Sequence, residues 1–462
     1  MNLVKSIRDH KLLDESKLQG LIVFFVKFIF LLFIGTLLVF ARPVLGLEIL
    51  SFKIGELGIL FSFLLSLIIF IMPKKIYLEY FGDTLFFYTQ KAIIFSFFLF
   101  ATISDSSFFS SYTYKSSSYI WSISFIYLGI LYLCNFRIEK YNPLLGLSAV
   151  PFVVYIMSTG NYPNFIMKFF KENSDKFQFL KPSDIFLGYV VANFANRFLF
   201  KTDKNRILYL VISTSLLAPL LLIGSRGSFL GLTIFFILEI FSKRKYLINN
   251  LRQSLLIFLV GIIVLMFSVS RIDFQNNANT NFAEDLIANS SPQGLVQSLR
   301  DFENEKDTVR VFFTFYWHYG RLASSDATTN WRLDIWQDIL FDMIDENRIF
   351  KGYGYKEVFP QMLDPEAPGR LGRDGLNENI HNYFMNIFAR GGVLQLILFL
   401  TLHMSYFLYW RRLNNNNQIL NFVIPCMVVS FLDVTMEGVH FPLIYFSFLY
   451  YFLNISSKVY KI

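Results

Sequence analysis

The stretch that decides the fold is Pro219-Leu-Leu-Leu-Ile-Gly-Ser-Arg-Gly-Ser-Phe-Leu-Gly-Leu232, in which a short polar turn joins two apolar segments. The flanking segments, near residues 207–223 and 227–242, have the length and composition of membrane-spanning helices. Arg226 is therefore expected at a membrane surface. A guanidinium stays charged there, and its planar fork matches phosphate oxygens.

The composition of the whole chain extends this prediction. Apolar residues make up 54% of the 462 residues and charged residues only 16%, whereas a soluble domain carries about 25% charged residues. Because apolar stretches recur from end to end, we predict an all-α polytopic integral membrane protein. Cys134 and Cys426 lie far apart inside apolar stretches, which favours neither a disulfide framework nor a metal site.

The net charge of +8 does not indicate a nucleic-acid partner, because the basic residues cluster at alternate ends of the apolar segments, as the positive-inside rule requires. With an even number of spans, this pattern predicts that both termini are cytoplasmic. We expect about twelve spans, with boundaries good to a few residues. They lie near residues 20–41, 54–72, 85–103, 119–134, 143–160, 184–200, 207–223, 227–242, 252–270, 383–410, 418–434 and 439–455.

The expected organisation has one large interruption, between the ninth and tenth spans. The segment 271–382 is roughly 110 residues long, and connections of that length are usually functional or disordered. Helical spacing in 286–303 and an amphipathic pattern in 331–344 predict a partly helical loop. The expected regions are a cytoplasmic leader (1–19), spans one to nine (20–270), a large periplasmic loop contributing to the active site (271–382), spans ten to twelve (383–455) and a cytoplasmic tail (456–462).

The first candidate motif is the Ser225-Arg226-Gly227 turn. An arginine at this place often only pairs with lipid phosphates at the interface. Gly224 and Gly227 permit close backbone approach and a helix N-terminus aimed at an anion, which favours a pyrophosphate site. We therefore assign Arg226 to a substrate diphosphate, with Ser225 in a supporting role.

The second candidate is Arg332, one helical turn before Trp336. Its alternative role is a solvated helix face, in contact with Trp336 or a nearby aspartate. A glycine-punctuated turn follows at Gly352 and Gly354. The surrounding residues match no dinucleotide-binding or P-loop pattern, so this turn alone does not predict a phosphate loop.

The third candidate is His381, which lies with Asn382 where the long loop enters the tenth span. Histidine titrates near neutral pH and is the usual general base, although a single interfacial histidine is more often merely hydrogen-bonded. Arg390, further into the same span, either lines the cavity or forms an interhelical contact. Asp433 and Glu437 flank the last outer turn and offer alternative carboxylate bases.

These motifs, in this order and on this topology, resemble the O-antigen polymerase and O-antigen ligase superfamily of C-type membrane glycosyltransferases. The resemblance covers about residues 205–410, whereas the N-terminal half resembles the family only in topology. The residues that carry it are Ser225, Arg226, Gly227, Arg332, Trp336, Gly352, Gly354, His381, Asn382, Gly391 and Gly392.

The resemblance implies transfer of a glycan from undecaprenyl diphosphate at the periplasmic face of the bacterial inner membrane. It also implies that no metal or other cofactor takes part, and the outer loops lack the Asp-x-Asp and His-x-x-x-His pairings of metal sites. Arg226 and Arg332 would then hold the diphosphate, and His381 would take the proton of the attacking hydroxyl. Trp336, Asn382, Arg390 and Glu437 would support them.

The motifs do not separate two activities in this family. A polymerase joins lipid-linked repeat units to one another, and a ligase passes finished chains to lipid A-core. The extreme Phe and Ile content and the large loop favour the polymerase, for which a chain-length-regulating co-polymerase is a family expectation. A transporter of lipid-linked sugars is a further alternative, disfavoured because ionisable residues collect at one surface rather than at mid-bilayer.

Overall fold

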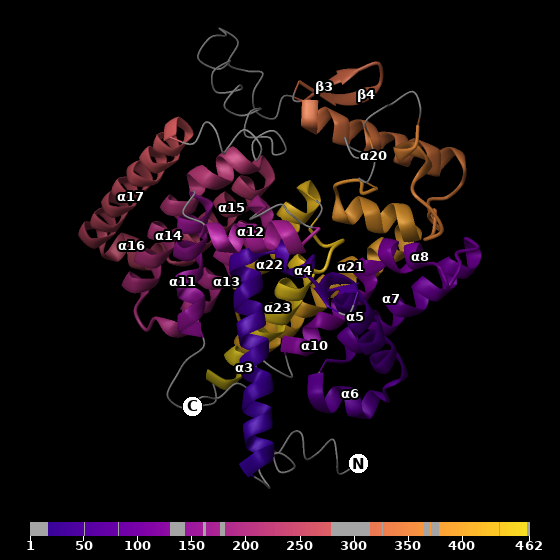
Figure 1. Cartoon of the computed structure of the whole chain (residues 1–462), viewed down its shortest axis with the longest axis horizontal. Helices are drawn as coiled ribbons and strands as arrows, with labels where there is room; N and C mark the ends of the chain where they lie inside the picture. Colours follow the sequence, from indigo (N-terminus) through magenta and orange to yellow (C-terminus); the bar gives the residue numbers. More distant parts are fainter. Residues whose placement is uncertain are drawn as a thin grey trace.

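The chain forms a bundle of tilted helices, seen in a computed structural model (Figure 1). Helical elements lie over the described part of each segment for which the sequence predicts a span. The described residues are 17–49, 51–81, 83–129, 144–159, 163–175, 181–278, 315–325, 327–364, 370, 378–433 and 435–459.

The elements of the first half include short helices between the long ones. In chain order they are α3 (Lys17–Phe40), α4 (Arg42–Leu45), β1 (Glu48–Ile49), β2 (Phe52–Lys53), α5 (Ile54–Ile71), α6 (Lys74–Phe81), α7 (Thr84–Ile103), α8 (Ser111–Ser116), α9 (Ser118–Trp121), η1 (Ser122–Phe125), α10 (Ile126–Leu128), α11 (Leu144–Ser158), α12 (Asn164–Asn173) and α13 (Pro182–Leu199).

The second half contains the long helices that carry the sequence motifs. Its elements are α14 (Asp203–Gly224), α15 (Arg226–Ser242), α16 (Arg244–Asn249), α17 (Leu251–Ala278), β3 (Phe315–His318), β4 (Arg321–Ser324), α20 (Ala327–Asp345), η4 (Pro360–Met362), α21 (Tyr383–Asn414), α22 (Leu420–Leu432) and α23 (His440–Val459).

Several of these helices are suited to a bilayer, so the protein is a multi-pass membrane protein. By length and composition, five described helices can cross a membrane, namely α5, α7, α14, α21 and the Leu251–Ile272 part of α17. Shorter apolar helices lie at Phe28–Phe40, Ser118–Leu128, Gly146–Ser158, Leu420–Leu432 and His440–Leu453. The total of twelve spans and their orientation stay predictions. The expected helix in 286–303 lies outside the described residues.

The predicted span at 119–134 differs from a regular helix. In the part that the structure describes, it is divided into α9, η1 and α10. The Ser122 hydroxyl donates to the carbonyl of Tyr119 at 3.1 Å, and that of Ser124 donates to the carbonyl of Ser62 on α5 at 2.8 Å. Serine hydroxyls compete with helical bonding in this way and join neighbouring helices inside a membrane. The serines therefore fix a broken helix between α5 and α23.

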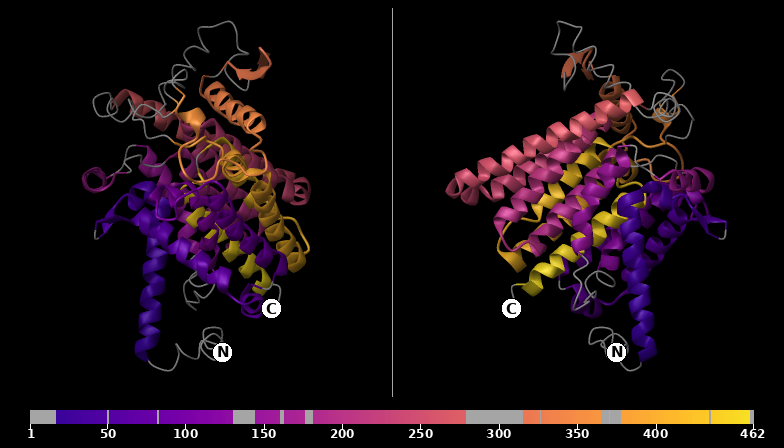
Figure 2. Two further views of the ribbon diagram at one scale, coloured as in Figure 1. Left: turned by 90° about the vertical axis from the view of Figure 1, so that its right-hand side faces the viewer. Right: turned by 60° about the vertical axis from the view of Figure 1, so that its left-hand side comes forward.

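Helix α20 and the β3–β4 hairpin lie at one end of the molecule, opposite the start of α3 and the end of α23 (Figures 1 and 2). The predicted amphipathic helix at 331–344 is confirmed as part of α20. Tyr319 and Gly320 connect the two strands with φ of 47° and 77°, as a tight two-residue hairpin turn requires. Its Trp317 and Tyr319 side chains are exposed.

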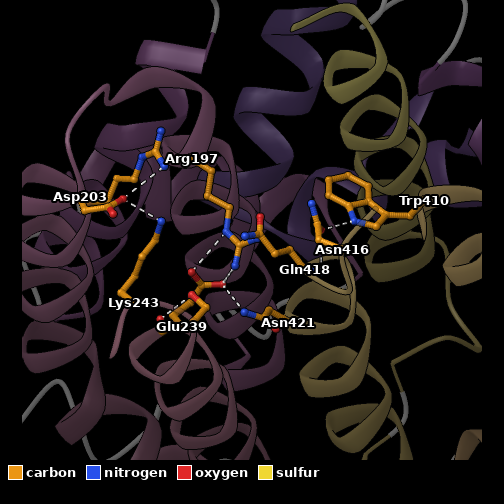
Figure 3. Close-up of polar contacts among 10 residues, drawn as sticks. Arg197, Asp203, Glu239, Lys243, Trp410, Asn416, Gln418 and Asn421 are labelled. Atoms are coloured by element: carbon orange, nitrogen blue, oxygen red, sulfur yellow. Dashed lines mark hydrogen bonds and ion pairs between the residues drawn. The ribbon is translucent and has the colours of Figure 1, made fainter. Parts of the chain in front are cut away.

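At the other end of α15 from Arg226, a polar network joins three helices (Figure 3). Arg197 of α13 forms a buried ion pair with Glu239 of α15. Arg197 also donates to Gln418 Oε1 at 3.1 Å, and Asn421 of α22 donates to Glu239 Oε1 at 3.0 Å. We call Arg197, Glu239, Gln418 and Asn421 the Glu239 cluster. Each buried charge in this cluster has a partner, so its role is structural.

Candidate active site

The Ser225-Arg226-Gly227 turn begins α15 directly after α14 ends. The Ser225 hydroxyl accepts a hydrogen bond from the backbone N–H of Ser228 at 3.3 Å and so caps the helix. A Cβ atom on Gly227 would lie 2.9 Å from Cβ of Leu432, at the end of α22. The glycine therefore permits close contact between α15 and α22, and it sets the half-buried Arg226 at that junction.

Helix α20 reaches the same junction from the long loop. The Arg332 guanidinium donates a hydrogen bond from Nη1 to the backbone carbonyl of Leu432. Gly227 and Arg332 therefore contact the same residue from different elements. The Ser-Arg-Gly turn and the Arg-x-x-x-Trp helix, which are about 100 positions apart in the sequence, meet at the C-terminal end of α22.

Two tryptophans of α20 hold the segment that contains His381. The Trp336 indole N–H donates to the carbonyl of Ile380 at 2.6 Å. The ring of Trp331 packs edge-on against the His381 imidazole, with a centroid distance of 5.1 Å. On the other side of His381, the buried Asn382 caps α21 by accepting a bond from the Met385 N–H at 3.0 Å. The imidazole is therefore fixed between a helix cap and α20.

The conformation and electrostatics of His381 are both unusual. Its φ is 54°, in the left-handed region that a non-glycine residue adopts only when its surroundings require it. Burial lowers the pKa of His381 to about 3, and the positive charge of Arg332 acts in the same direction. The imidazole is consequently neutral at physiological pH, which is the protonation state that a general base needs.

An ion pair that sequence reasoning did not predict completes this end of the bundle. Lys181, just before α13, donates to Asp433 Oδ1 at 2.7 Å, across 252 positions of the sequence. Burial alone would raise the pKa of Asp433, but Lys181 and further arginines outweigh it and hold the pKa below its usual value. We call Lys181, Arg332, His381, Asp433 and Glu437 the outer cluster. No local pattern around Lys181 distinguishes it from other loop lysines.

A second set of contacts that the sequence did not predict lies beside the outer cluster. Asp184 of α13 accepts a bond from Arg42 Nε at 3.2 Å and lies 3.1 Å from His440 Nδ1. The other ring nitrogen of His440 lies 2.8 Å from the carbonyl of Leu37. These contacts join α3, α4, α13 and α23. Sequence position predicts only that Arg42 and His440 flank spans, and it does not predict their shared partner.

Arg390 is separate from the His381 contacts; it braces neighbouring elements and also lines a small cavity. Its guanidinium donates to the carbonyls of Gly354 at 3.1 Å and Glu357 at 2.7 Å, and to the Tyr112 hydroxyl at 3.0 Å. It also packs 3.9 Å from the centroid of the Phe359 ring. Arg390 therefore joins α21, the loop after α20 and α8.

The glycine-punctuated turn binds a break in α21 rather than an anion. Gly392 interrupts the helix with φ of 65°, so carbonyls near the break lose their usual partners. The N–H groups of Tyr353 and Gly354 donate to the carbonyls of Ala389 at 2.8 Å and Arg390 at 2.9 Å. In return, the N–H of Val393 donates to the carbonyl of Ile349 at 2.8 Å. The turn thereby supplies the hydrogen bonds that the kink removes.

Close packing explains why glycine is needed on both sides of this contact. A Cβ on Gly352 would lie 2.4 Å from the carbonyl oxygen of Arg390, and one on Gly392 would lie 2.3 Å from that of Phe350. Gly352 and Gly354 also have φ of 65° and 76°. The Gly-x-Gly and Gly-Gly motifs are thus two halves of one contact that anchors the long loop onto α21.

Glu437 lies in the loop between α22 and α23. The Ser118 hydroxyl donates to its backbone carbonyl at 2.7 Å. Within the described part of the chain, neither oxygen of its solvent-shielded carboxyl group has a hydrogen-bond partner. Burial raises the pKa of Glu437 to about 8. The carboxyl group borders a small cavity lined by Tyr112, Lys115, Ser116, Ser118, Glu378, Asn379, Asn386 and Arg390.

Comparison with known proteins adds one match. Residues 209–400 match the family model for O-antigen ligase. The matched segment contains Arg226, Arg332 and His381, and it supports the resemblance to the O-antigen polymerase and ligase superfamily that the sequence indicates. The match does not distinguish polymerase from ligase. No curated protein matches the chain.

Proposed function

We propose that this multi-pass protein, whose residues 209–400 match the O-antigen ligase family, polymerises lipid-linked polysaccharide repeat units. In this proposal, a glycan passes from undecaprenyl diphosphate to a sugar hydroxyl of another lipid-linked repeat unit. The observation that carries the proposal is the meeting of the Ser-Arg-Gly turn, α20 and the His381 segment around the end of α22. The reaction would take place at the periplasmic face of the inner membrane, with both termini cytoplasmic and segment 271–382 covering the site.

The reaction needs a base and stabilisation of the leaving group. As the bond between the sugar's anomeric carbon and the diphosphate oxygen breaks, negative charge develops on the diphosphate. Arg226 and Arg332 would stabilise this charge through paired, charge-assisted hydrogen bonds. The acceptor oxygen forms the new bond from the opposite face, which inverts the anomeric configuration, and its proton passes to a ring nitrogen of His381.

The low pKa of His381 suits this sequence of events. A neutral imidazole is ready to accept a proton. A bound diphosphate adds negative charge near the ring, and opposite charge favours the protonated form of histidine. Substrate binding and leaving-group departure would therefore both raise the basicity of His381 when the proton is transferred.

A ligase is the second candidate, since the matched family is described as O-antigen ligase. The two activities give different lipopolysaccharide in a strain from which the gene is deleted. Core carrying a single repeat unit identifies a polymerase, whereas bare core with accumulated lipid-linked polymer identifies a ligase. An unchanged ladder contradicts both activities and favours a transporter or another kind of glycan transfer.

Complementation of the deletion strain tests the proposed site. We expect the wild-type gene to restore the ladder and His381→Ala to fail at equal protein level. His318→Ala is the matched control, because His318 is exposed on the β3–β4 hairpin. Restoration of the full ladder by His381→Ala would remove His381 from the mechanism.

A further inference from the structure

The carboxyl group of Glu437 is buried at the edge of a cavity without a hydrogen-bond partner among the described residues. A buried acceptor that lacks a partner is destabilising. Its neighbours do not explain its position, because Ser118 bonds to the Glu437 backbone and Arg390 donates to Gly354, Glu357 and Tyr112. A group that supplies donors from within the cavity would relieve this cost.

The cavity lining has the chemistry of a carbohydrate site. Its volume is about 60 Å³, enough for a hydroxyl-bearing edge of a sugar or a few water molecules. Tyr112, Asn379 and Asn386 line it and provide hydroxyl and amide groups, which both donate and accept hydrogen bonds. At its border, Lys115 forms an ion pair with Glu378 at 2.7 Å. A lining that combines donors and acceptors fits an uncharged polyhydroxyl ligand.

We propose that this cavity is the acceptor-sugar subsite, in which the Glu437 carboxyl group and the Asn379 and Asn386 amides bind hydroxyls of the incoming glycan. The proposal rests on the proposed transferase function and adds where the acceptor binds. The two carboxyl groups in the lining, Glu378 and Glu437, disfavour a phosphate at this place, so the diphosphate and the acceptor are assigned to separate regions.

The position of Glu437 relative to the other residues of the outer cluster fits this assignment. Asp433 and Lys181 influence the pKa of both Glu437 and His381. Asn379, in the cavity lining, lies two residues before His381, and Glu437 lies four residues after Asp433. A sugar in the Glu437 cavity would therefore lie at the same end of the bundle as His381 and the Lys181–Asp433 pair.

The test uses the purified full-length protein and lipid-linked repeat units from the deletion strain. The probe is the free repeat-unit oligosaccharide, released from the same lipid by mild acid, and the readout is its inhibition constant against transfer. We expect Glu437→Ala to weaken inhibition about tenfold, since the carboxyl group can bond to ligand hydroxyls through both of its oxygens and each such bond is worth roughly fivefold in affinity. The rate at saturating lipid-linked substrate should fall less than that of His381→Ala, because Glu437 binds the acceptor and does not transfer the proton.

Three further variants show whether the effect belongs to the cavity. Asn379→Ala, on the same lining, should weaken inhibition in the same direction. Glu437→Gln should recover part of the loss, because an amide still bonds to hydroxyls. Glu346→Ala removes an exposed carboxylate at the end of α20 and should leave the inhibition constant unchanged. Because the Glu437 side chain has no hydrogen bond to lose among the described residues, the melting midpoint of Glu437→Ala without ligand should not fall.

Distinct results contradict the subsite and the proposed function. Equal inhibition of wild type and Glu437→Ala would overturn the subsite while leaving the transferase intact. A hundredfold lower rate at saturating substrate with unchanged inhibition would also overturn it, because Glu437 would then act in proton transfer. Absence of any transfer by the folded wild-type protein would instead reject the proposed function, and the subsite with it.

Discussion

Glu239 and Glu437 are both buried carboxyl groups, and their surroundings are opposite. In the Glu239 cluster, Arg197 and Asn421 bond to the carboxylate (Figure 3). In the outer cluster, the carboxyl oxygens of Glu437 have no hydrogen-bond partner among the described residues, and burial raises the pKa of Glu437 to about 8. Arg226 and Glu239 lie 13 positions apart on α15, which places the two regions about 20 Å apart along one helix.

The difference between Glu239 and Glu437 distinguishes a buried charge with a structural role from a buried group with a functional role. A buried charge whose partners are all supplied by the protein holds helices in place, and removal of one partner is costly. Buried groups with shifted pKa values and incomplete bonding concentrate at functional sites, because a ligand supplies what is missing. Variants in the two regions should therefore affect different properties, which makes the comparison testable.

Glu239→Ala should have the largest effect, and on stability. It leaves the buried Arg197 without its carboxylate, and such a change costs about 3–5 kcal/mol. The melting midpoint in detergent should fall strongly, while transfer activity per folded molecule should stay near wild type. The control Glu346→Ala, at an exposed site, should shift stability by less than about 0.5 kcal/mol. An unchanged midpoint for Glu239→Ala would remove the structural half of the comparison.

Arg332→Ala should act mainly on catalysis. Loss of one preorganised donor to a developing oxyanion typically lowers the rate about 100- to 1,000-fold. Arg332→Lys should recover only part of the rate, because an ammonium lacks the bidentate geometry of a guanidinium. Arg252→Ala, an exposed arginine on α17, is the matched control. If Arg332→Ala transferred glycan at the wild-type rate, the diphosphate would have to bind elsewhere.

Gly352→Ala should weaken the anchoring of the long loop by about 1–3 kcal/mol, from backbone strain together with the close contact to Arg390. Gly320→Ala separates these two causes. Gly320 has a similar positive φ of 77°, but nothing lies within 4 Å of an added Cβ. Thermal unfolding of both variants measures the difference. Equal losses would mean that the contact between the Gly352 turn and α21 contributes little.

Glu437→Gln should change stability in a way that depends on pH. The raised pKa means that the folded protein holds a proton on Glu437 that the unfolded chain releases above pH 4.5. The contribution of Glu437 to the free energy of unfolding of the wild-type protein is therefore fully present below pH 4.5. It is lost as the pH rises towards 8. Glutamine does not titrate, so the variant should melt like wild type at pH 4.5 and at a higher temperature at pH 8. The reverse pH trend would contradict a raised pKa.

Many of the helices can be predicted from the sequence, because a long apolar segment indicates a helix that lies in a bilayer. The α14–turn–α15 unit around Arg226 is predicted closely, and so is α20 around Arg332 and Trp336. The break at η1 is not, because serine hydroxyls act through partners such as Ser62 that are distant in the sequence. The kink at Gly392 depends similarly on the Gly352 turn.

The candidate site shows the same limit. His381 and Arg332 are recognisable because their motifs are local. The Lys181–Asp433 pair spans 252 positions, and no periodic pattern connects the two residues. Glu437 is identified only as one of two carboxylates near an outer turn, since burial and missing partners are properties of the packed structure.

The most direct test of the proposed reaction is release of undecaprenyl diphosphate by purified protein supplied with lipid-linked repeat units. We predict one lipid diphosphate released for each glycosidic bond formed by the wild-type protein, and the same result with the control His318→Ala. His381→Ala should lower the rate about 100- to 10,000-fold, the usual contribution of a general base. Wild-type release by folded His381→Ala protein would contradict the assignment of His381, and bond formation without lipid diphosphate release would contradict the reaction itself.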